Sequence, residues 1–156
     1  MIKLIPDIRP KEGFGELKFG ETSDHVINVL GDPDEIETIQ DDDAFNTTIL
    51  NYWDFGVSAF FEGNEKSVLS CLETDIEEST LFGKKIFEMN ELQIIGLMKE
   101  KGFEVAETEE EPDGERRISY DDALIDFFFM EGELIAVNWG VLVNEHGEIE
   151  EFEMNS

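Results

Sequence analysis

Two stretches of the chain repeat an alternation of aromatic and acidic residues, and this pattern is the best candidate for a functional surface. Side chains of a β-strand alternate between the two faces of a sheet, so residues two apart share a face. In 51–61 and again in 119–129, the side chains expected to point outward follow the order Tyr, Asp, Ser or Asp, and Phe. They are Tyr52, Asp54, Ser58 and Phe60 in the first stretch, and Tyr120, Asp122, Asp126 and Phe128 in the second.

A surface of this composition suits protein binding. Rigid aromatic side chains anchor interfaces, and carboxylates steer a basic partner. The alternative is structural: the aromatic side chains would cover the far side of a sheet that is buried on both faces. The residues predicted to bind a partner are Tyr52, Asp54, Phe60, Tyr120, Asp122, Asp126 and Phe128.

No catalytic motif accompanies this surface. Nothing in the sequence places His25 or His146 near a nucleophile or in a metal-binding motif. The serines lack the glycine frame of a nucleophile elbow, and carboxylates are so numerous that no acid–base pair stands out. The acidic run 41–43 could bind a hard cation, but it lacks the Gly and Glu of an EF-hand loop, which favours a polar loop. We therefore expect a protein that is not an enzyme, with no cofactor and no metal site.

The charge of the chain limits its partners. With 39 acidic against 11 basic residues, the formal net charge is -28. Binding of nucleic acid depends on Lys and Arg, and anionic membranes attract basic segments, so we expect neither ligand. A basic partner, a cation or a high-salt habitat would suit this acidity, although most such charges simply cover a solvated surface. We predict a basic protein partner, and the sequence leaves the oligomeric state undefined.

The N-terminus and the cysteine content indicate a cytoplasmic protein. The apolar run in 1–5 is too short for a signal peptide and is followed by Pro6 and Asp7. No stretch reaches the length of a membrane span. Cys71 is the single cysteine, so no disulfide can form within the chain, and we expect it to be a small core residue.

Two hairpins and two short helices must position the predicted surface. The hairpins are expected at 51–72 and 119–139, because each joins two apolar runs through a Gly-containing turn. The first helix should begin at one of three candidate N-caps, Thr22, Ser23 or Asp24, and the second after Asn90, and they should stop at Gly31 and Gly102. The acidic segment 107–115 is expected to be a mobile hairpin loop with a Pro-Asp-Gly turn. The core side of the first hairpin is assigned to Trp53, Phe55, Val57, Ala59 and Phe61.

The order helix, strand, loop and long hairpin occurs twice along the chain. A twofold repeat of one supersecondary unit is the simplest explanation. The predicted fold class is α+β, with two copies of a helix packed on an antiparallel β-sheet. The first repeat, with an N-terminal arm, would span 1–78 and the second 79–156, and the two would form one compact unit.

The first expected helix also carries a family signature. Its matching residues, in the pattern G-x-S/T-x-x-x-V-x-x-x-L-G-x-P, are Gly20, Thr22, Val26, Leu30, Gly31 and Pro33. This segment resembles the small α+β repeat shared by the β-lactamase-inhibitor proteins and the SmpA/BamE-type outer-membrane assembly lipoproteins. In the inhibitor, two such units present a concave sheet to a protein partner.

The resemblance implies a tandem α+β fold and a non-enzymatic protein-binding module, such as an inhibitor or immunity protein directed against a basic toxin or enzyme. The alternative function is that of a cytoplasmic α+β domain with a small-molecule or cation site, or of a hydrolase without a recognised motif.

Overall fold

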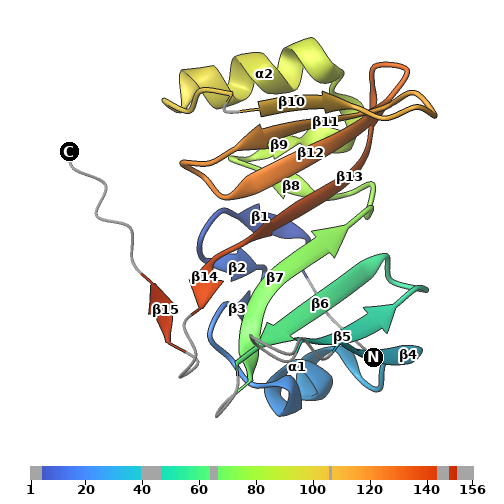
Figure 1. Ribbon diagram of the computed structural model, residues 1–156, viewed down its shortest axis with the longest axis vertical. Coiled ribbons are helices and arrows are strands. Elements are labelled where there is room, and N and C mark those ends of the chain that lie inside the picture. Colours follow the sequence, from blue (N-terminus) through green and yellow to red (C-terminus); the bar gives the residue numbers. More distant parts are fainter. Residues whose placement is uncertain (1–4, 40–46, 64–66, 106, 144–147, 151–156) are drawn as a thin grey trace.

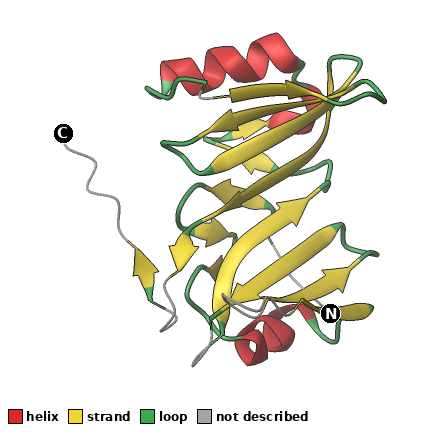
Figure 2. Cartoon of the chain, viewed as in Figure 1, coloured by secondary structure: helices red, strands yellow, loops and turns green. Residues whose placement is uncertain are grey.

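The computed structural model describes residues 5–39, 47–63, 67–105, 107–143 and 148–150. The described part of the protein is mostly β, with 48% of its residues in strands and two short α-helices (Figure 2). The predicted fold class, two copies of a helix on an antiparallel sheet, is therefore wrong. The helices of 8 and 10 residues are too short to cover the large sheet alone, and a second sheet built from glycine-rich segments shares that task.

The larger sheet has eight antiparallel strands in the order β10-β11-β12-β13-β7-β6-β5-β4 (Figure 1). Strands β13 and β7 join its two halves, with Val137 opposite Thr74 and Gly140 opposite Cys71. The strands are β4 (Glu35–Ile39), β5 (Thr47–Tyr52), β6 (Val57–Glu62), β7 (Val68–Thr74), β10 (Glu107–Glu110), β11 (Glu115–Tyr120), β12 (Ile125–Met130) and β13 (Glu133–Gly140).

The smaller sheet has five strands in the order β3-β2-β1-β8-β9, and β1 pairs with β8 in parallel. Its strands are β1 (Asp7–Arg9), β2 (Gly13–Phe14), β3 (Leu17–Lys18), β8 (Thr80–Leu81) and β9 (Lys84–Lys85). A 3-10 helix, η1 (Ile86–Glu88), follows β9, and β14 (Leu142–Val143) pairs with β15 (Ile149–Glu150). Gly13 and Gly15 have positive φ, which allows the tight β1–β2–β3 meander.

The two helices lie where the caps predicted them, at opposite ends of the large sheet (Figure 1). Helix α1 (Ser23–Leu30) begins at Thr22, whose hydroxyl accepts from the His25 N–H, and stops at Gly31 with φ 87°. Helix α2 (Glu91–Glu100) begins with a capping box between Asn90 and Gln93. These starts and stops are confirmed because local hydrogen bonds determine them.

The core lies between the two sheets. One row across the large sheet, on its core side, consists of Leu50, Ala59, Leu72, Trp139, Ile125 and Tyr120. Trp139 is 0% exposed, and its indole N–H donates to the Gly13 carbonyl at 2.9 Å. The Phe14 ring packs edge-on against Trp139 with centroids 5.1 Å apart. These contacts fasten the small sheet to β13.

The first predicted hairpin differs from the structure in one decisive respect. Strand β5 ends at Tyr52, a turn spans 53–56, and β6 starts at Val57, so 51–61 is not one strand. Trp53 and Phe55 are 61% and 40% exposed, and their assignment to the core is wrong. The predicted burial of Val57, Ala59 and Phe61 is confirmed.

The second hairpin repeats this difference, because a turn at 121–124 separates β11 from β12. The turn that follows β12 is confirmed at Glu131 and Gly132, whose φ values of 53° and 84° match a type I′ turn.

The acidic segment 107–115 is partly an edge strand, where a loop was expected. Strand β10 pairs along its length with β11, and only the Pro-Asp-Gly turn is confirmed. Arg117 pairs with Glu109 at 2.6 Å, and Arg116 lies 3.5 Å from both Glu110 and Glu91. These ion pairs stabilise the pairing of the acidic segment with β11.

The run 41–43 and His146 lie outside the described residues, and the division of the chain at 78/79 stays a prediction. None of the helices in the described ranges is long and apolar enough to cross a membrane.

Candidate functional site

The face of the large sheet that points away from the core is the candidate site, and we call it the open face. Along β6 and β12, buried residues alternate strictly with half-buried ones. The half-buried set includes Ser58, Phe60, Asp126 and Phe128. The open face is therefore accessible along the middle of the sheet, where the two halves meet.

A row of polar side chains crosses the open face. The strand register places Asn51, Ser58, Glu73, Asn138, Asp126 and Ser119 side by side, and we call these residues the polar row. Ser58 Oγ donates to Asn51 Oδ1 at 2.7 Å, and Asn138 Nδ2 donates to Glu73 Oε1 at 3.4 Å. Within the part of the chain that the structure describes, neither Glu73 nor Asp126 forms an ion pair with a Lys or Arg. Both carboxylates remain able to receive an external cation.

The two phenylalanines of the prediction flank the polar row. Phe60 pairs with Cys71 on one side of it, and Phe128 pairs with Ala136 on the other. A register shift follows each of them, between Phe60 and Phe61 and between Phe128 and Phe129. Such β-bulges change the direction in which side chains point from a sheet. Here each bulge ends the regular alternation of side chains between the two faces, next to a phenylalanine ring.

The structure brings only part of the predicted set together. Phe60, Asp126 and Phe128 lie on the open face as expected. Asp54 and Asp122 are exposed, but the turns that carry them extend from opposite ends of the strands, beyond Val57 and Ile125 respectively.

The outward direction predicted for the two tyrosines is wrong. Tyr52 is 1% exposed and Tyr120 is 2% exposed. In one continuous strand, Tyr52 and Val57 would face opposite ways. They are instead a directly opposed hairpin pair and share the core face. The partner-binding role of the remaining residues stays a prediction.

Trp53 is a site residue that the sequence analysis missed. It lines a cavity of about 240 Å³ on one side of the polar row, beside Ser58 and Glu73, together with Gly56, Val57, Thr74, Asp75 and Ala136. The signal that could have revealed it is the Asp54–Gly56 segment, whose Asp and Gly are typical turn residues. A turn there removes Trp53 from the alternation of the strand.

A second cavity of about 340 Å³ opens on the other side of the polar row, next to Cys71 and Asn138. Cys71 lies half-buried on the open face, so its assignment to the core is wrong. Its thiol donates to Asn138 Oδ1 at 3.1 Å. Burial raises the pKa of Cys71, the hydrogen bond with Asn138 lowers it, and the nearby carboxylates, Glu62 first, raise it, so that the pKa is about 12. A thiol with this pKa stays protonated at neutral pH and is a poor nucleophile.

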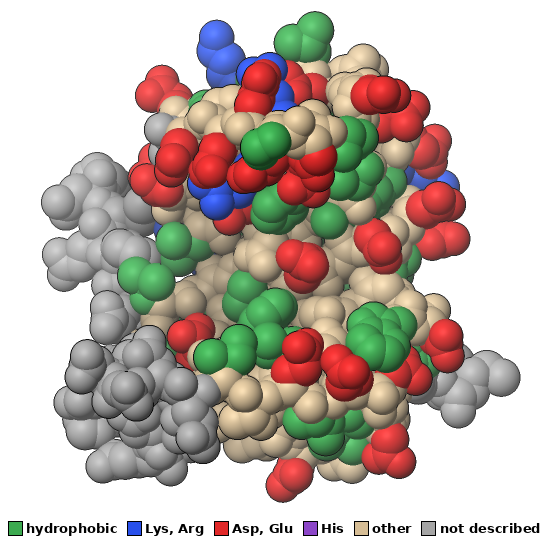
Figure 3. Space-filling model, turned by 45° about the vertical axis from the view of Figure 1, so that its right-hand side comes forward, with side chains coloured by type: hydrophobic (Ala, Val, Ile, Leu, Met, Phe, Trp, Pro, Cys, Tyr) green, Lys and Arg blue, Asp and Glu red, His purple; other side chains and the backbone are tan. Residues whose placement is uncertain are grey.

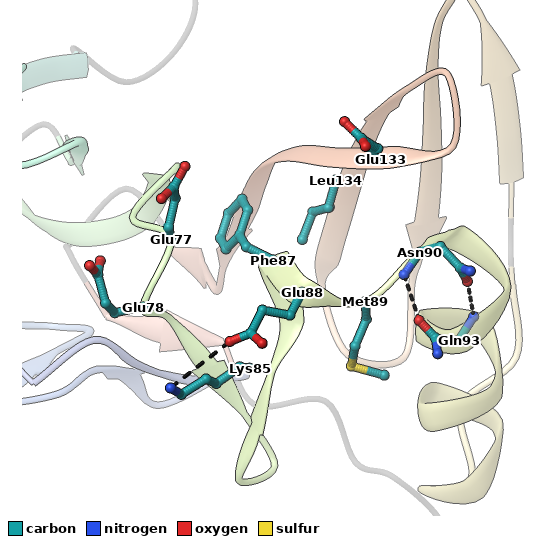
Figure 4. Close-up of a pocket in the computed structure, with 10 residues that line it drawn as sticks. All are labelled: Glu77, Glu78, Lys85, Phe87, Glu88, Met89, Asn90, Gln93, Glu133 and Leu134. Carbon is teal, nitrogen blue, oxygen red and sulfur yellow. Dashed lines mark hydrogen bonds and ion pairs between the residues drawn. The ribbon is translucent and has the colours of Figure 1, made fainter.

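The largest cavity, about 630 Å³, lies away from the open face, where η1 and the start of α2 approach β13 (Figure 4). Phe87, Met89 and Leu134 supply its apolar lining. Its polar groups largely satisfy one another: Lys85 lies 3.9 Å from Glu88, and Asn90 and Gln93 bond each other in the capping box. Its remaining lining residues are Glu77, Glu78 and Glu133.

Acidic side chains are spread over the surface, with hydrophobic side chains exposed between them (Figure 3). The described part of the chain contains no group of three or more His, Cys, Asp or Glu side chains that could hold a metal ion.

No model of a known protein family matches the chain, and no curated protein matches it significantly. An extracellular protein containing an SCP domain, from Bacillus anthracis, is similar in structure with a TM-score of 0.46 and 14% identity. That match covers 85% of this chain and 47% of that protein, so this chain spans about half its length. A DUF4309 family protein, YjgB from Bacillus subtilis, gives a TM-score of 0.41 and 16% identity over 75% of this chain and 76% of that one.

At this level of similarity neither protein assigns a function to the chain. The resemblance to the β-lactamase-inhibitor proteins and the cytoplasmic location stay predictions.

Two weakly acidic side chains of the sheet, the Cys71 thiol and the Tyr52 phenol, predict a loss of stability at alkaline pH. The pKa of Cys71 is raised from 9.0 to about 12, and burial with Asp32 and Asp34 nearby raises that of Tyr52 from 10.0 to about 12. The unfolded chain therefore releases protons that the folded protein keeps. These groups stabilise the fold fully below about pH 9, and we expect the free energy of unfolding to fall as the pH rises toward 12.

Urea denaturation at several values between pH 8 and pH 11.5 measures this slope. Cys71→Ala should flatten its lower part, because Cys71 has the lowest ordinary pKa of these groups. An unchanged slope in that variant would contradict the assignment.

Proposed function

We propose that the protein is a non-enzymatic binding module whose open face binds a basic region of a protein partner. The observation that carries the proposal is the polar row, in which Glu73 and Asp126 have no cationic partner among the described residues and aromatic rings lie on both sides. Aromatic anchors with nearby charges are the usual composition of an interface. The net charge of -28 adds long-range attraction for a basic partner.

The contacts on the open face also support binding over hydrolysis. The Cys71 thiol is held protonated by its raised pKa. Ser70 Oγ donates to Glu62 Oε1 at 2.6 Å, and Ser58 Oγ donates to Asn51, so among the described residues neither hydroxyl donates to a histidine base. The cavity near η1 has the volume of a small-molecule site, but Lys85, Glu88, Asn90 and Gln93 of its lining pair with one another.

The experiment compares three forms of the protein as bait in a lysate of the source organism. The test variant is Glu73→Gln/Asp126→Asn. The control, Glu100→Gln/Glu104→Gln, removes the same charge from exposed positions off the sheet. We expect wild type and control to retain the same basic protein. The test variant should bind it at least about tenfold more weakly, a loss of roughly 1.4 kcal/mol.

Added salt should weaken retention by the wild type, because the attraction is electrostatic. Equal retention by the test variant, or retention of no basic protein by the wild type, would contradict the proposal.

A further inference from the structure

The Trp53 cavity has the features of a subsite for one cationic side chain. It lies where the β5–β6 turn meets the end of β7, on one side of the polar row. Its volume of about 240 Å³ is below the usual range of small-molecule pockets, which begins near 300 Å³. An indole that is 61% exposed lines it, together with the carboxylates Glu73 and Asp75.

Several hydrogen bonds hold this cavity in place. The backbone N–H of Trp53 donates to Asp34 Oδ2 at 2.9 Å. The Gly56 carbonyl accepts from Thr74 Oγ1 at 2.7 Å and from the Asp75 N–H at 3.1 Å. Gly56 has φ 74°, and a β-carbon there would collide with the Asp75 carboxylate. These hydrogen bonds hold the 53–56 turn, which carries the indole, against the end of β7, where Glu73 and Asp75 lie. The site is therefore preorganised for a ligand.

The negative charge of the cavity favours a cationic occupant. Among the residues that the structure describes, no Lys or Arg forms an ion pair with Glu73 or Asp75. A cation placed against an indole gains cation–π energy, and Trp gives the strongest such contact. A guanidinium group can also stack flat on a ring while donating two parallel hydrogen bonds to a carboxylate, which an ammonium group cannot do.

We propose that this cavity holds an arginine side chain of the basic partner, stacked on Trp53 and paired with Glu73 and Asp75. The inference rests on the proposed function and makes it specific: the partner presents an arginine on the side of the polar row that faces the β5–β6 turn. The Asn138 amide donates to Glu73 Oε1 at 3.4 Å and would help to orient that carboxylate toward the guanidinium.

The fluorescence of Trp53 makes a direct test possible without the partner. The chain has two tryptophans, and Trp139 is 0% exposed, so acrylamide quenches mainly Trp53. The probes are three peptides, acetyl-Gly-X-Gly-amide with X as arginine, lysine or citrulline, the last being a neutral analogue of arginine. At millimolar concentration the arginine peptide should lower the quenching constant about twofold, and citrulline should leave it unchanged.

The variant Glu73→Gln/Asp75→Asn should lose the protection, and Glu100→Gln/Glu104→Gln should keep it. Equal protection by arginine and citrulline, or full protection in the first variant, would overturn the inference. Equal protection by lysine would overturn the assignment to arginine.

The quenching experiment on Trp53 and the lysate experiment can fail independently of each other. If the lysate partner is retained through Glu73 and Asp126 while the arginine peptide gives no protection, the subsite is wrong and the open face still binds. If the peptide protects Trp53 but no basic protein is retained, the proposed function fails.

Discussion

Replacing Tyr52 by alanine should lower the free energy of unfolding by about 3–5 kcal/mol, the range found when large aromatic core residues are truncated. The ring is 1% exposed and packs against Phe55 with centroids 6.2 Å apart. Its hydroxyl donates to the Gly31 carbonyl at 2.8 Å, which ties the end of β5 to the end of α1. Urea denaturation followed by circular dichroism measures the loss.

A pair of conservative variants separates the ring from the hydroxyl. Tyr52→Phe should cost about 1–2 kcal/mol, because the Gly31 carbonyl loses its donor. Tyr120→Phe is the matched control. The Tyr120 hydroxyl is buried without a hydrogen-bond partner among the described residues, so its removal should be neutral or slightly stabilising. Equal losses in the two variants would show that the Tyr52–Gly31 hydrogen bond contributes nothing to stability.

The second large effect is expected at the junction of the two halves of the sheet. Gly140 lies opposite Cys71, and a β-carbon there would collide with the Ser70 carbonyl. Because that obstacle is backbone, Gly140→Ala must push β13 away from β7. We expect a loss of about 1–3 kcal/mol or more. The Val141 N–H donates to the same carbonyl at 2.8 Å, so this hydrogen bond should weaken as well.

The control for Gly140→Ala is Gly96→Ala. Gly96 lies inside α2, and a β-carbon there meets nothing within 4 Å. Alanine should therefore stabilise the protein by about 0.5–1 kcal/mol through its higher helix propensity. Thermal and urea denaturation of both variants should give shifts of opposite sign. A stabilised Gly140→Ala protein would contradict the close approach of β13 to β7.

The ion pairs of β11 show how a charge pattern can change the interpretation of a segment. The run of glutamates in 107–111 is typical of a loop when it is considered alone. In the sheet, Arg116 and Arg117 of the neighbouring strand pair with Glu110, Glu109 and Glu107. No spacing rule along the sequence predicts these cross-strand pairs, because they depend on the turn at 111–114 and on the register that it imposes.

The sequence by itself determined the features that rest on contacts between close neighbours. The N-cap of α1 at Thr22, the Asn90–Gln93 capping box, the stop at Gly31 and the turn at Glu131 are examples. Each depends on one side chain or one dihedral angle within a few residues, so a short pattern is sufficient to predict it. The strong acidity, and with it the expectation of a basic partner, also comes from the sequence alone.

Only the tertiary structure decided which residues lie on the open face. The apolar run through Tyr52 and Trp53 is compatible with one long strand or with two strands and a turn. The choice moves Tyr52 into the core and Trp53 to the surface, because an interruption of the alternation changes the face of every residue beyond it. The two-residue strands of the small sheet are too short to show a periodicity, and they exist because they cover Trp139 and the core around it. The open face and the Trp53 cavity result from these long-range contacts, which no local pattern in the chain encodes.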